Sequence, residues 1–292
     1  MSALSPHPRG VRLPQRRVWI NGTIVSGAEA ALSLFDRGAR DGEGLLETVR
    51  INAGVPHLWE RHLERLMLSA AELGFPVPVS PTSLSDALGE LLALENLSDA
   101  VARLTVTRGV PGGRPTRAGA WIEVEPLSGR LWSGTRSGAA TAIVSRTPFE
   151  PGSLGRHKTT SRMAYSLARE EARAARVDEA LLASASGELL EGAVSNVFVV
   201  RGGEVFTPPL ERGILPGLAR AMVLVLCSDL RIPARECSLS VRDLLEADEA
   251  FLSSSVQEVA PLASADGRAF PSREIGLRLR DAFRLSASGR NA

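Results

Sequence analysis

The chain has 292 residues, of which 44% are apolar and 23% charged, and its 34 basic and 33 acidic side chains leave a net charge of +1. This apolar content excludes an intrinsically disordered chain, and the balanced charge gives no general attraction to nucleic acid or to an anionic membrane. The sequence has no apolar run near the roughly 20 residues that span a bilayer and no signal-peptide pattern at its start. Two cysteines cannot make a disulfide framework, so we expect a cytoplasmic location.

The first part of the chain predicts hairpins and two helices. Residues 1–15 are rich in Pro and Arg and predict a mobile tail. An Asn-Gly pair between apolar runs predicts a β-hairpin over 17–25, and a second hairpin is predicted around 52–54. Apolar residues that recur every three or four positions predict a helix over 59–73. The other elements predicted here are a helix over 82–94, strands over 101–107 and 120–125, and a Gly- and Pro-rich loop over 108–116.

The second part predicts alternating strands and helices. The predicted strands cover 141–145, 179–182, 194–200, 204–207 and 249–253, and the predicted helices cover 161–175, 216–228, 241–246 and 273–285. Mixed elements of this kind predict an α+β fold with two domains that meet at a cleft. We expect a small N-terminal domain over 16–130, a linker over 131–140 and a larger C-terminal domain over 141–292.

Lys158 is the single lysine among the 34 basic residues, so the other 33 are arginines. Arginine stays protonated and cannot act as an amine nucleophile, whereas a lysine with a lowered pKa can form a Schiff base with an aldehyde. The flanking Arg156, His157 and Arg162 are expected to lower the pKa of Lys158 by like-charge repulsion. Chance survival of one surface lysine is the alternative, and composition alone leaves both open.

Several common catalytic motifs are missing from the sequence. It contains no P-loop, no glycine motif in the context of a dinucleotide site, and no nucleophile elbow. Its four histidines and two cysteines have no metal-ligand spacing, so we expect no metal. Lysine chemistry and a few sites that could bind an anion are what remain.

Four places could bind a charged group or a ring nitrogen. Residues 213–220 form a turn into a helix, where free N–H groups at Gly217–Ala219 could hold a phosphate, although a plain helix start explains them too. Ser253–Ser255 offer three hydroxyls or form an ordinary turn. Arg65 lies near the apolar stripe of its helix and either extends to solvent or binds phosphate through its forked guanidinium. Glu191, between two strand-like runs, could keep a ring nitrogen protonated or lie in a surface turn.

Together these segments resemble the fold-type IV enzymes of pyridoxal phosphate, the class IV aminotransferases. This family includes branched-chain and D-amino acid aminotransferases and aminodeoxychorismate lyase. The resemblance runs in order over roughly residues 16–270 and is carried by residues 35–50, 62–70, 158, 190–198, 213–220 and 251–261. It implies a small α/β domain and a larger barrel-like α/β domain with a cleft between them, pyridoxal 5'-phosphate as cofactor, and a homodimer whose second chain helps to complete the cleft.

The resemblance also implies roles for individual residues. Lys158 is expected to bind the cofactor as an aldimine and to move the substrate proton, and Glu191 is expected to pair with the pyridine nitrogen. The residues expected to hold the phosphate are Arg65, the backbone of Leu218 and Ala219, and Ser254 and Ser255. Two positions depart from the family: Ala219 stands where Thr is frequent, and Met163 stands where the transaminases commonly have a Tyr.

The substrate is less closely defined than the cofactor. By resemblance, Arg114 is the first candidate for binding a substrate carboxylate and Arg103 the second, and Leu46 replaces the usual aromatic residue and implies a roomier pocket. The expected reaction moves an amino group between an amino acid and a 2-oxo acid. The alternative, favoured by the Lys-x-x-x-Arg run at 158–162, is an aminodeoxychorismate lyase that releases pyruvate to give 4-aminobenzoate. A protein that binds the cofactor without catalysis is a third hypothesis.

Overall fold

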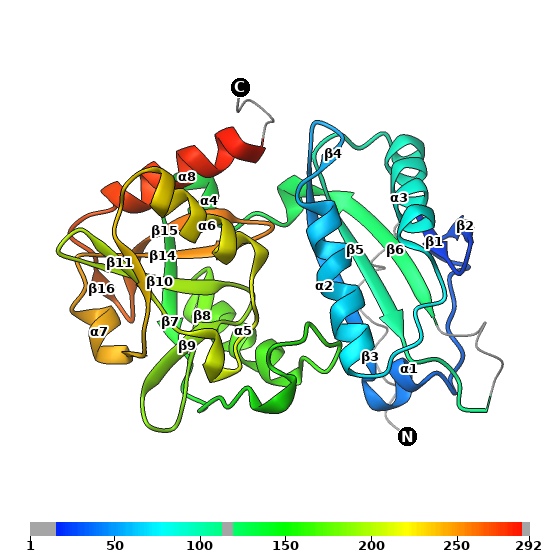
Figure 1. The fold of residues 1–292 in the computed structure, drawn as a ribbon, viewed down its shortest axis with the longest axis horizontal. Coiled ribbons are helices and arrows are strands. Elements are labelled where there is room, and N and C mark those ends of the chain that lie inside the picture. The colour runs from blue at the N-terminus through cyan, green and yellow to red at the C-terminus, as the bar shows by residue number, and fades with distance from the viewer. Residues whose placement is uncertain (1–15, 113–118, 288–292) are drawn as a thin grey trace, which may run out of the picture.

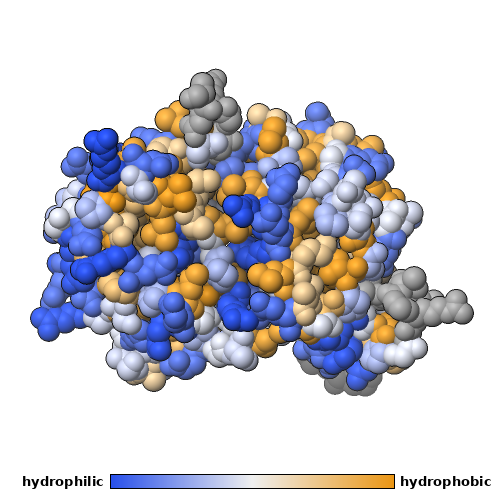
Figure 2. All heavy atoms as spheres, in the orientation of Figure 1, coloured by the Kyte–Doolittle hydropathy of each residue, from blue (hydrophilic) through white to orange (hydrophobic). Residues whose placement is uncertain are grey.

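The computed structural model of the chain describes residues 16–112 and 119–287, so the predicted tail over 1–15 lies outside the described residues. The elements within residues 17–126 (β1 to β6), coloured from blue to blue-green, form one lobe in Figure 1, and the green to red elements within residues 133–287 (α4 to α8) form the other. Each lobe combines helices with a sheet, which confirms the α+β class. Hydrophilic and hydrophobic residues are interspersed over the face in Figure 2. No helix in the described ranges is long and apolar enough to cross a membrane.

The N-terminal lobe is built on a six-stranded antiparallel sheet in the order β2-β1-β6-β5-β3-β4. Its strands are β1 (Arg17–Ile20), β2 (Thr23–Ser26), β3 (Gly44–Asn52), β4 (Val55–Pro56), β5 (Ala100–Thr107) and β6 (Ala120–Pro126). Both predicted hairpins are confirmed, as β1–β2 and β3–β4. Strand β3 pairs with β5 along most of its length, from Gly44 opposite Thr107 to Ile51 opposite Ala100, which holds β3 firmly in the sheet.

Two helices pack on this sheet through their apolar faces. Helix α2 (Trp59–Glu72) buries Trp59, Leu63 and Leu66, and α3 (Pro81–Glu95) buries Leu84, Leu88 and Leu91 in the same core. The apolar spacing predicted both helices to within one residue at each end. A short helix that we did not predict, α1 (Arg37–Asp41), begins where the Asp36 carboxylate accepts the Gly38 N–H at 2.7 Å.

The segment between the two sheets has regular structure of its own. It contains the short 3-10 turn η2 (Leu127–Gly129) and helix α4 (Ser133–Ser137), and Ala140 already lies in strand β7. The Gln257 side chain holds this segment, because its Oε1 accepts the Trp132 N–H at 3.1 Å and the Thr135 hydroxyl at 2.8 Å. The domain boundaries at 16–130, 131–140 and 141–292 stay a proposal.

The C-terminal lobe contains a ten-stranded sheet in the order β12-β11-β10-β14-β15-β7-β8-β9-β13, with β16 paired to β15. Its strands are β7 (Ala140–Val144), β8 (Glu179–Ala183), β9 (Glu188–Gly192), β10 (Asn196–Arg201), β11 (Glu204–Thr207), β12 (Ala234–Glu236), β13 (Leu239–Ser240), β14 (Glu249–Ser254), β15 (Glu258–Ala265) and β16 (Arg268–Ala269). Its helices are α5 (Met163–Ala175), α6 (Leu218–Asp229), α7 (Val241–Leu245) and α8 (Glu274–Ala287), with 3-10 turns η3 (Gly152–Leu154) and η4 (Leu210–Arg212). Phe198 and Phe251 stack 4.7 Å apart under α6 and α8.

In this lobe some strands were not predicted and two predicted helix starts were wrong. Strands β9 and β15 were not predicted, because β9 is short and bounded by turns and β15 contains Pro261 among small residues. Helix α6 begins at Leu218 with Gly217 as its N-cap, so Pro216 lies outside the helix. Helix α5 begins at Met163 rather than at 161, because the residues before it are bonded to the other lobe.

Candidate active site

The segment that carries Lys158 is pinned to strand β3 of the other lobe. The Leu46 N–H donates to the Lys158 carbonyl oxygen at 2.8 Å, and the Thr160 N–H donates to the Gly44 carbonyl at 2.8 Å. Gly42 has φ +70°, and a Cβ there would stand 2.7 Å from the Ser161 hydroxyl, so this approach requires glycine. The backbone of Lys158 is therefore fixed where the two lobes meet.

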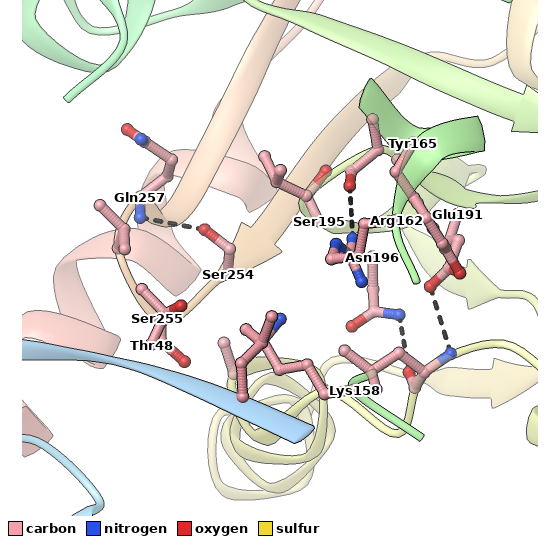
Figure 3. Close-up of a pocket in the computed structure, with 18 of the residues that line it drawn as sticks. Thr48, Lys158, Arg162, Tyr165, Glu191, Ser195, Asn196, Ser254, Ser255 and Gln257 are labelled. Atoms are coloured by element: carbon pink, nitrogen blue, oxygen red, sulfur yellow. Dashed lines mark hydrogen bonds between the residues drawn. The ribbon is translucent and has the colours of Figure 1, made fainter. Parts of the chain in front are cut away.

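A cavity of about 450 Å³ lies at this junction and is lined from both lobes. Each predicted site residue that the structure describes lines it: Leu46, Arg65, Arg103, Lys158, Glu191, Leu218, Ala219, Ser254 and Ser255. Arg114 lies outside the described residues. Figure 3 shows Lys158 between two groups, with Ser254, Ser255 and Thr48 on one side and Glu191, Tyr165 and Arg162 on the other.

The Lys158 amine lies in surroundings that favour its neutral form. Burial lowers its pKa to about 7, assisted by the charges of Arg162 and Arg65 and opposed by nearby carboxylates. The predicted action of Arg162 is confirmed, but that of Arg156 and His157 is wrong. Arg156 pairs with Glu72 at 2.6 Å, and the His157 ring bonds the Ser69 hydroxyl at 3.1 Å, so both side chains are engaged by α2.

Glu191 lies in strand β9, not in a turn, and its side chain is buried. One carboxylate oxygen, Oε2, accepts the Leu215 N–H at 3.2 Å, and the other, Oε1, accepts the Tyr165 hydroxyl at 3.2 Å. Burial raises the pKa of Glu191 to about 7, although these hydrogen bonds and the cations Arg162 and Lys158 favour its ionised form. A buried carboxyl near neutrality responds strongly to any cation or proton donor placed beside it.

Arg65 belongs to a buried network that sequence reasoning missed. Its Nε and Nη2 donate to the two oxygens of Glu47 at 2.8 and 2.6 Å, and its Nη1 donates to the Pro216 carbonyl at 2.9 Å. Glu47 also accepts from His62 Nδ1 at 2.7 Å, and His62 Nε2 lies 3.3 Å from the Ser255 hydroxyl. The network therefore connects Arg65 of α2 with Ser255 of the other lobe. Its sequence signal was a glutamate inside an apolar strand and a histidine three residues before an arginine on one helix.

The cavity wall beside Ser254 fits a phosphate group. Helix α6 starts at Leu218 without a side-chain cap, so the N–H groups of its first turn carry a partial positive charge toward the cavity lining. The Ser253 hydroxyl is buried and has no hydrogen-bond partner among the described residues. A phosphate would satisfy both kinds of donor and would lie on the same cavity as Arg65.

Other lining residues were not predicted as site residues. Tyr165 and Arg169 follow Arg162, the N-cap of α5, by three and seven residues, so all three lie along one face of the helix, and this face lines the cavity. The spacing could have indicated them in the sequence. Asn196 supports the loop before α6, because its Nδ2 donates to the Leu215 carbonyl at 3.0 Å. Arg103, the second candidate for a substrate carboxylate, lines the cavity. Its Nε makes a long ion pair of 3.8 Å with Oε1 of the exposed Glu123.

Comparisons with known proteins agree with this arrangement. The family model of class IV aminotransferases matches residues 44–265. A Methanocaldococcus jannaschii protein with the provisional name branched-chain-amino-acid aminotransferase is 34% identical over 268 residues, 89% of this chain and 91% of its own. The aminodeoxychorismate lyase of Bacillus subtilis is 30% identical over 259 residues, 85% of this chain and 86% of its own. The branched-chain aminotransferase of Thermoproteus uzoniensis with norvaline superposes with a TM-score of 0.84 at 28% identity, covering 94% of this chain and 96% of its own. The chain therefore belongs to the class IV aminotransferase family.

Proposed function

We propose that this chain binds pyridoxal 5'-phosphate on Lys158 and moves an amino group between an amino acid and a 2-oxo acid. Enzymes of this family depend on pyridoxal phosphate. The observation that carries the proposal is the cavity itself, in which the only lysine of the chain lies between a buried carboxylate and a set of anion-binding groups. Reaction with an aldehyde needs a neutral amine, and the pKa of Lys158, lowered to about 7 by burial and by Arg162 and Arg65, provides one.

The cavity residues would hold the two ends of the cofactor. Arg65, Ser254, Ser255 and the N–H groups of Leu218 and Ala219 would bind the phosphate, and Glu191 would keep the ring nitrogen protonated. When bound, the cofactor supplies an electron sink for the charge that develops at the substrate Cα. The Lys158 amine would remove the substrate Cα proton as general base and return it later.

Substrate recognition requires a cation for the carboxylate and space for the side chain. Arg103 lines the cavity, and its one ion pair with the described residues is long, at 3.8 Å, so its guanidinium could bind a carboxylate. Arg114 keeps its place as the first candidate from the sequence. Leu46 is buried in the wall and leaves more space than an aromatic ring would.

An aminodeoxychorismate lyase is the second candidate, and Arg162 is the observation that favours it. Arg162 follows Lys158 by four residues, lines the cavity and donates to the Ala193 carbonyl at 3.0 Å. Met163 stands where the transaminases commonly have a Tyr, so this position offers no hydroxyl, and the residue is 74% exposed. A lyase uses the same cofactor residues but expels pyruvate from the substrate, so those residues do not separate the two reactions.

A half-reaction experiment tests the proposal. The purified holoenzyme is mixed with D- and L-amino acids without any 2-oxo acid, and the absorbance of the bound cofactor is followed. An aminotransferase bleaches the band near ~420 nm and forms one 2-oxo acid per site. Turnover of aminodeoxychorismate without that bleaching assigns the lyase, and a band that no amine alters supports a cofactor-binding protein without catalysis.

We also propose that the chain works as a homodimer in the cytoplasm. Large apolar side chains are exposed at Leu34 and Phe35, with 85% and 67% of their surface accessible, and a second copy that covered them would remove this area from water. Sedimentation equilibrium measures the mass in solution. A concentration-independent monomer would contradict the homodimer.

A further inference from the structure

Tyr165 is the only tyrosine of the chain, and both its ring and its hydroxyl are held in place. The guanidinium carbon of Arg162 lies 3.9 Å from the centre of the ring, and Phe149 meets the ring edge-on at 5.0 Å. These contacts on two sides restrict the ring to one orientation. In that orientation the hydroxyl donates to Glu191 Oε1 at 3.2 Å, at the cavity wall.

The surroundings of the Glu191 carboxylate leave Tyr165 a defined task. Four groups face it: the Leu215 N–H from the loop before α6, Arg162 and Tyr165 from the start of α5, and Lys158 from the segment before α5. Leu215 holds Oε2 through the backbone, and the two cations act through charge. Among the described residues, Tyr165 provides the only side-chain hydrogen bond to the carboxylate.

The direction of this hydrogen bond is defined. Burial raises the pKa of the Tyr165 hydroxyl above its usual range, and the negative charge of Glu191 raises it further. The phenol therefore keeps its proton and is the donor in this hydrogen bond, and the carboxylate is the acceptor. A hydrogen bond donated to a carboxylate stabilises the ionised form of that carboxylate.

We propose that Tyr165 is a positioning residue for Glu191, whose hydroxyl orients this carboxylate and keeps it ionised at the place where the cofactor presents its ring nitrogen. This inference rests on the proposed function. It assigns to the single tyrosine a role that acts through Glu191 and requires no contact between Tyr165 and the substrate. Removing the hydroxyl alone, as in Tyr165→Phe, leaves the ring contacts with Arg162 and Phe149 in place.

The expected effect follows from the strength of one charged hydrogen bond. Such a bond is worth about tenfold in an equilibrium constant, so Tyr165→Phe should move the acid limb of the half-reaction rate up by about one pH unit. The sign is upward, because the carboxylate becomes harder to ionise without its donor. The affinity for pyridoxal phosphate should fall in the same variant, since an ionised Glu191 pairs better with a protonated ring nitrogen.

The test uses three forms of the holoenzyme: the wild type, Tyr165→Phe, and the wild type grown with 3-fluorotyrosine. Since the chain has one tyrosine, this label changes residue 165 alone, and it makes the phenol a stronger donor. The absorbance of the bound cofactor and the half-reaction rate are measured against pH. We expect the acid limb to be highest in Tyr165→Phe, intermediate in the wild type and lowest in the fluorinated form.

Phe149→Leu is the matched control, because it disturbs the packing of the ring and retains the hydroxyl. It should lower thermal stability and leave the acid limb unchanged. An identical acid limb in all three forms would overturn the inference, and so would a shift in Phe149→Leu as large as in Tyr165→Phe. If Tyr165→Phe does not fold, the comparison of the fluorinated form with the wild type still tests the inference, because the acid limb should be lower in the fluorinated form. Failure of the wild type to bind pyridoxal phosphate at all would instead refute the proposed function.

Discussion

Substituting Glu47 by Gln removes the one negative charge at the centre of the buried network between the lobes. The Glu47 side chain is 1% exposed and receives two hydrogen bonds from Arg65 and one from His62. In Glu47→Gln, the Arg65 guanidinium loses its counter-charge in a site that water barely reaches. We therefore expect a large loss of stability, and a weaker hold on the phosphate of the cofactor because Arg65 is no longer oriented.

The lowered pKa of Glu47 and the usual cost of breaking a buried ion pair both set the size of this loss. Burial raises the pKa of Glu47, but the charge of Arg65 and the hydrogen bonds from His62 and Arg65 lower it more, from 4.5 to about 2. A lowering of this size corresponds to about 3 kcal/mol of stability, fully present above about pH 4.5 and lost as the pH falls toward 2. Mutation of one partner of a buried ion pair costs about 3–5 kcal/mol in other proteins.

Urea unfolding of the cofactor-free chain at pH 7 measures this loss directly. Glu64→Gln is the matched control, because Glu64 lies on the same helix as Arg65 and its ion pair with Arg61 is exposed. That control should lose less than about 1 kcal/mol. The difference between Glu47→Gln and the wild type should shrink as the pH falls below 4.5. A loss in Glu47→Gln no larger than in Glu64→Gln would refute the argument.

Three further predictions concern the cavity. Lys158→Ala should abolish the absorbance of the covalently bound cofactor and all turnover, and colour with undiminished turnover would contradict the role of Lys158. Ser253→Ala should lower the affinity for pyridoxal phosphate several-fold and leave the affinity for pyridoxal unchanged, as titration measures. It should not reduce stability in thermal unfolding, because the buried hydroxyl has no hydrogen-bond partner within 16–112 and 119–287. Because burial, Arg162 and Arg65 lower the pKa of Lys158 to about 7, stopped-flow uptake of pyridoxal phosphate should accelerate with a midpoint near pH 7, and a midpoint near 10 would be inconsistent with the buried site.

Local patterns were sufficient for much of the fold. The hairpin β1–β2 follows from its Asn-Gly turn and the helices α2 and α3 from apolar spacing, since these signals act over a few residues. Strand β9 was not predicted because its pairing with the neighbouring strands β8 and β13 is what makes it a strand: Leu181 of β8 lies opposite Gly192, and Leu239 of β13 lies opposite Leu189. That pairing is a tertiary contact without a periodic pattern of its own.

The site was predicted where residue type alone carries the chemistry. Lys158 stood out as the one lysine, and Glu191 and Arg65 through their place in the family pattern. The hydrogen-bond partners in the buried network are distant in the sequence: Glu47 lies 18 residues from Arg65, and Ser255 lies 193 residues from His62. The packing of α2 beside β3 brings Arg65 to Glu47, and the docking of the two lobes brings Ser255 to His62. Both are tertiary contacts, so neither could be read from the sequence.

Covalent attachment of the cofactor at one defined amine is the claim on which the account depends. The chain is incubated with pyridoxal phosphate, reduced with borohydride and digested, and the peptides are identified by mass spectrometry. The account predicts one phosphopyridoxyl group per chain, on the peptide that contains Lys158. A chain that takes up no label, or that carries it on another amine with Lys158 unmodified, would contradict the account.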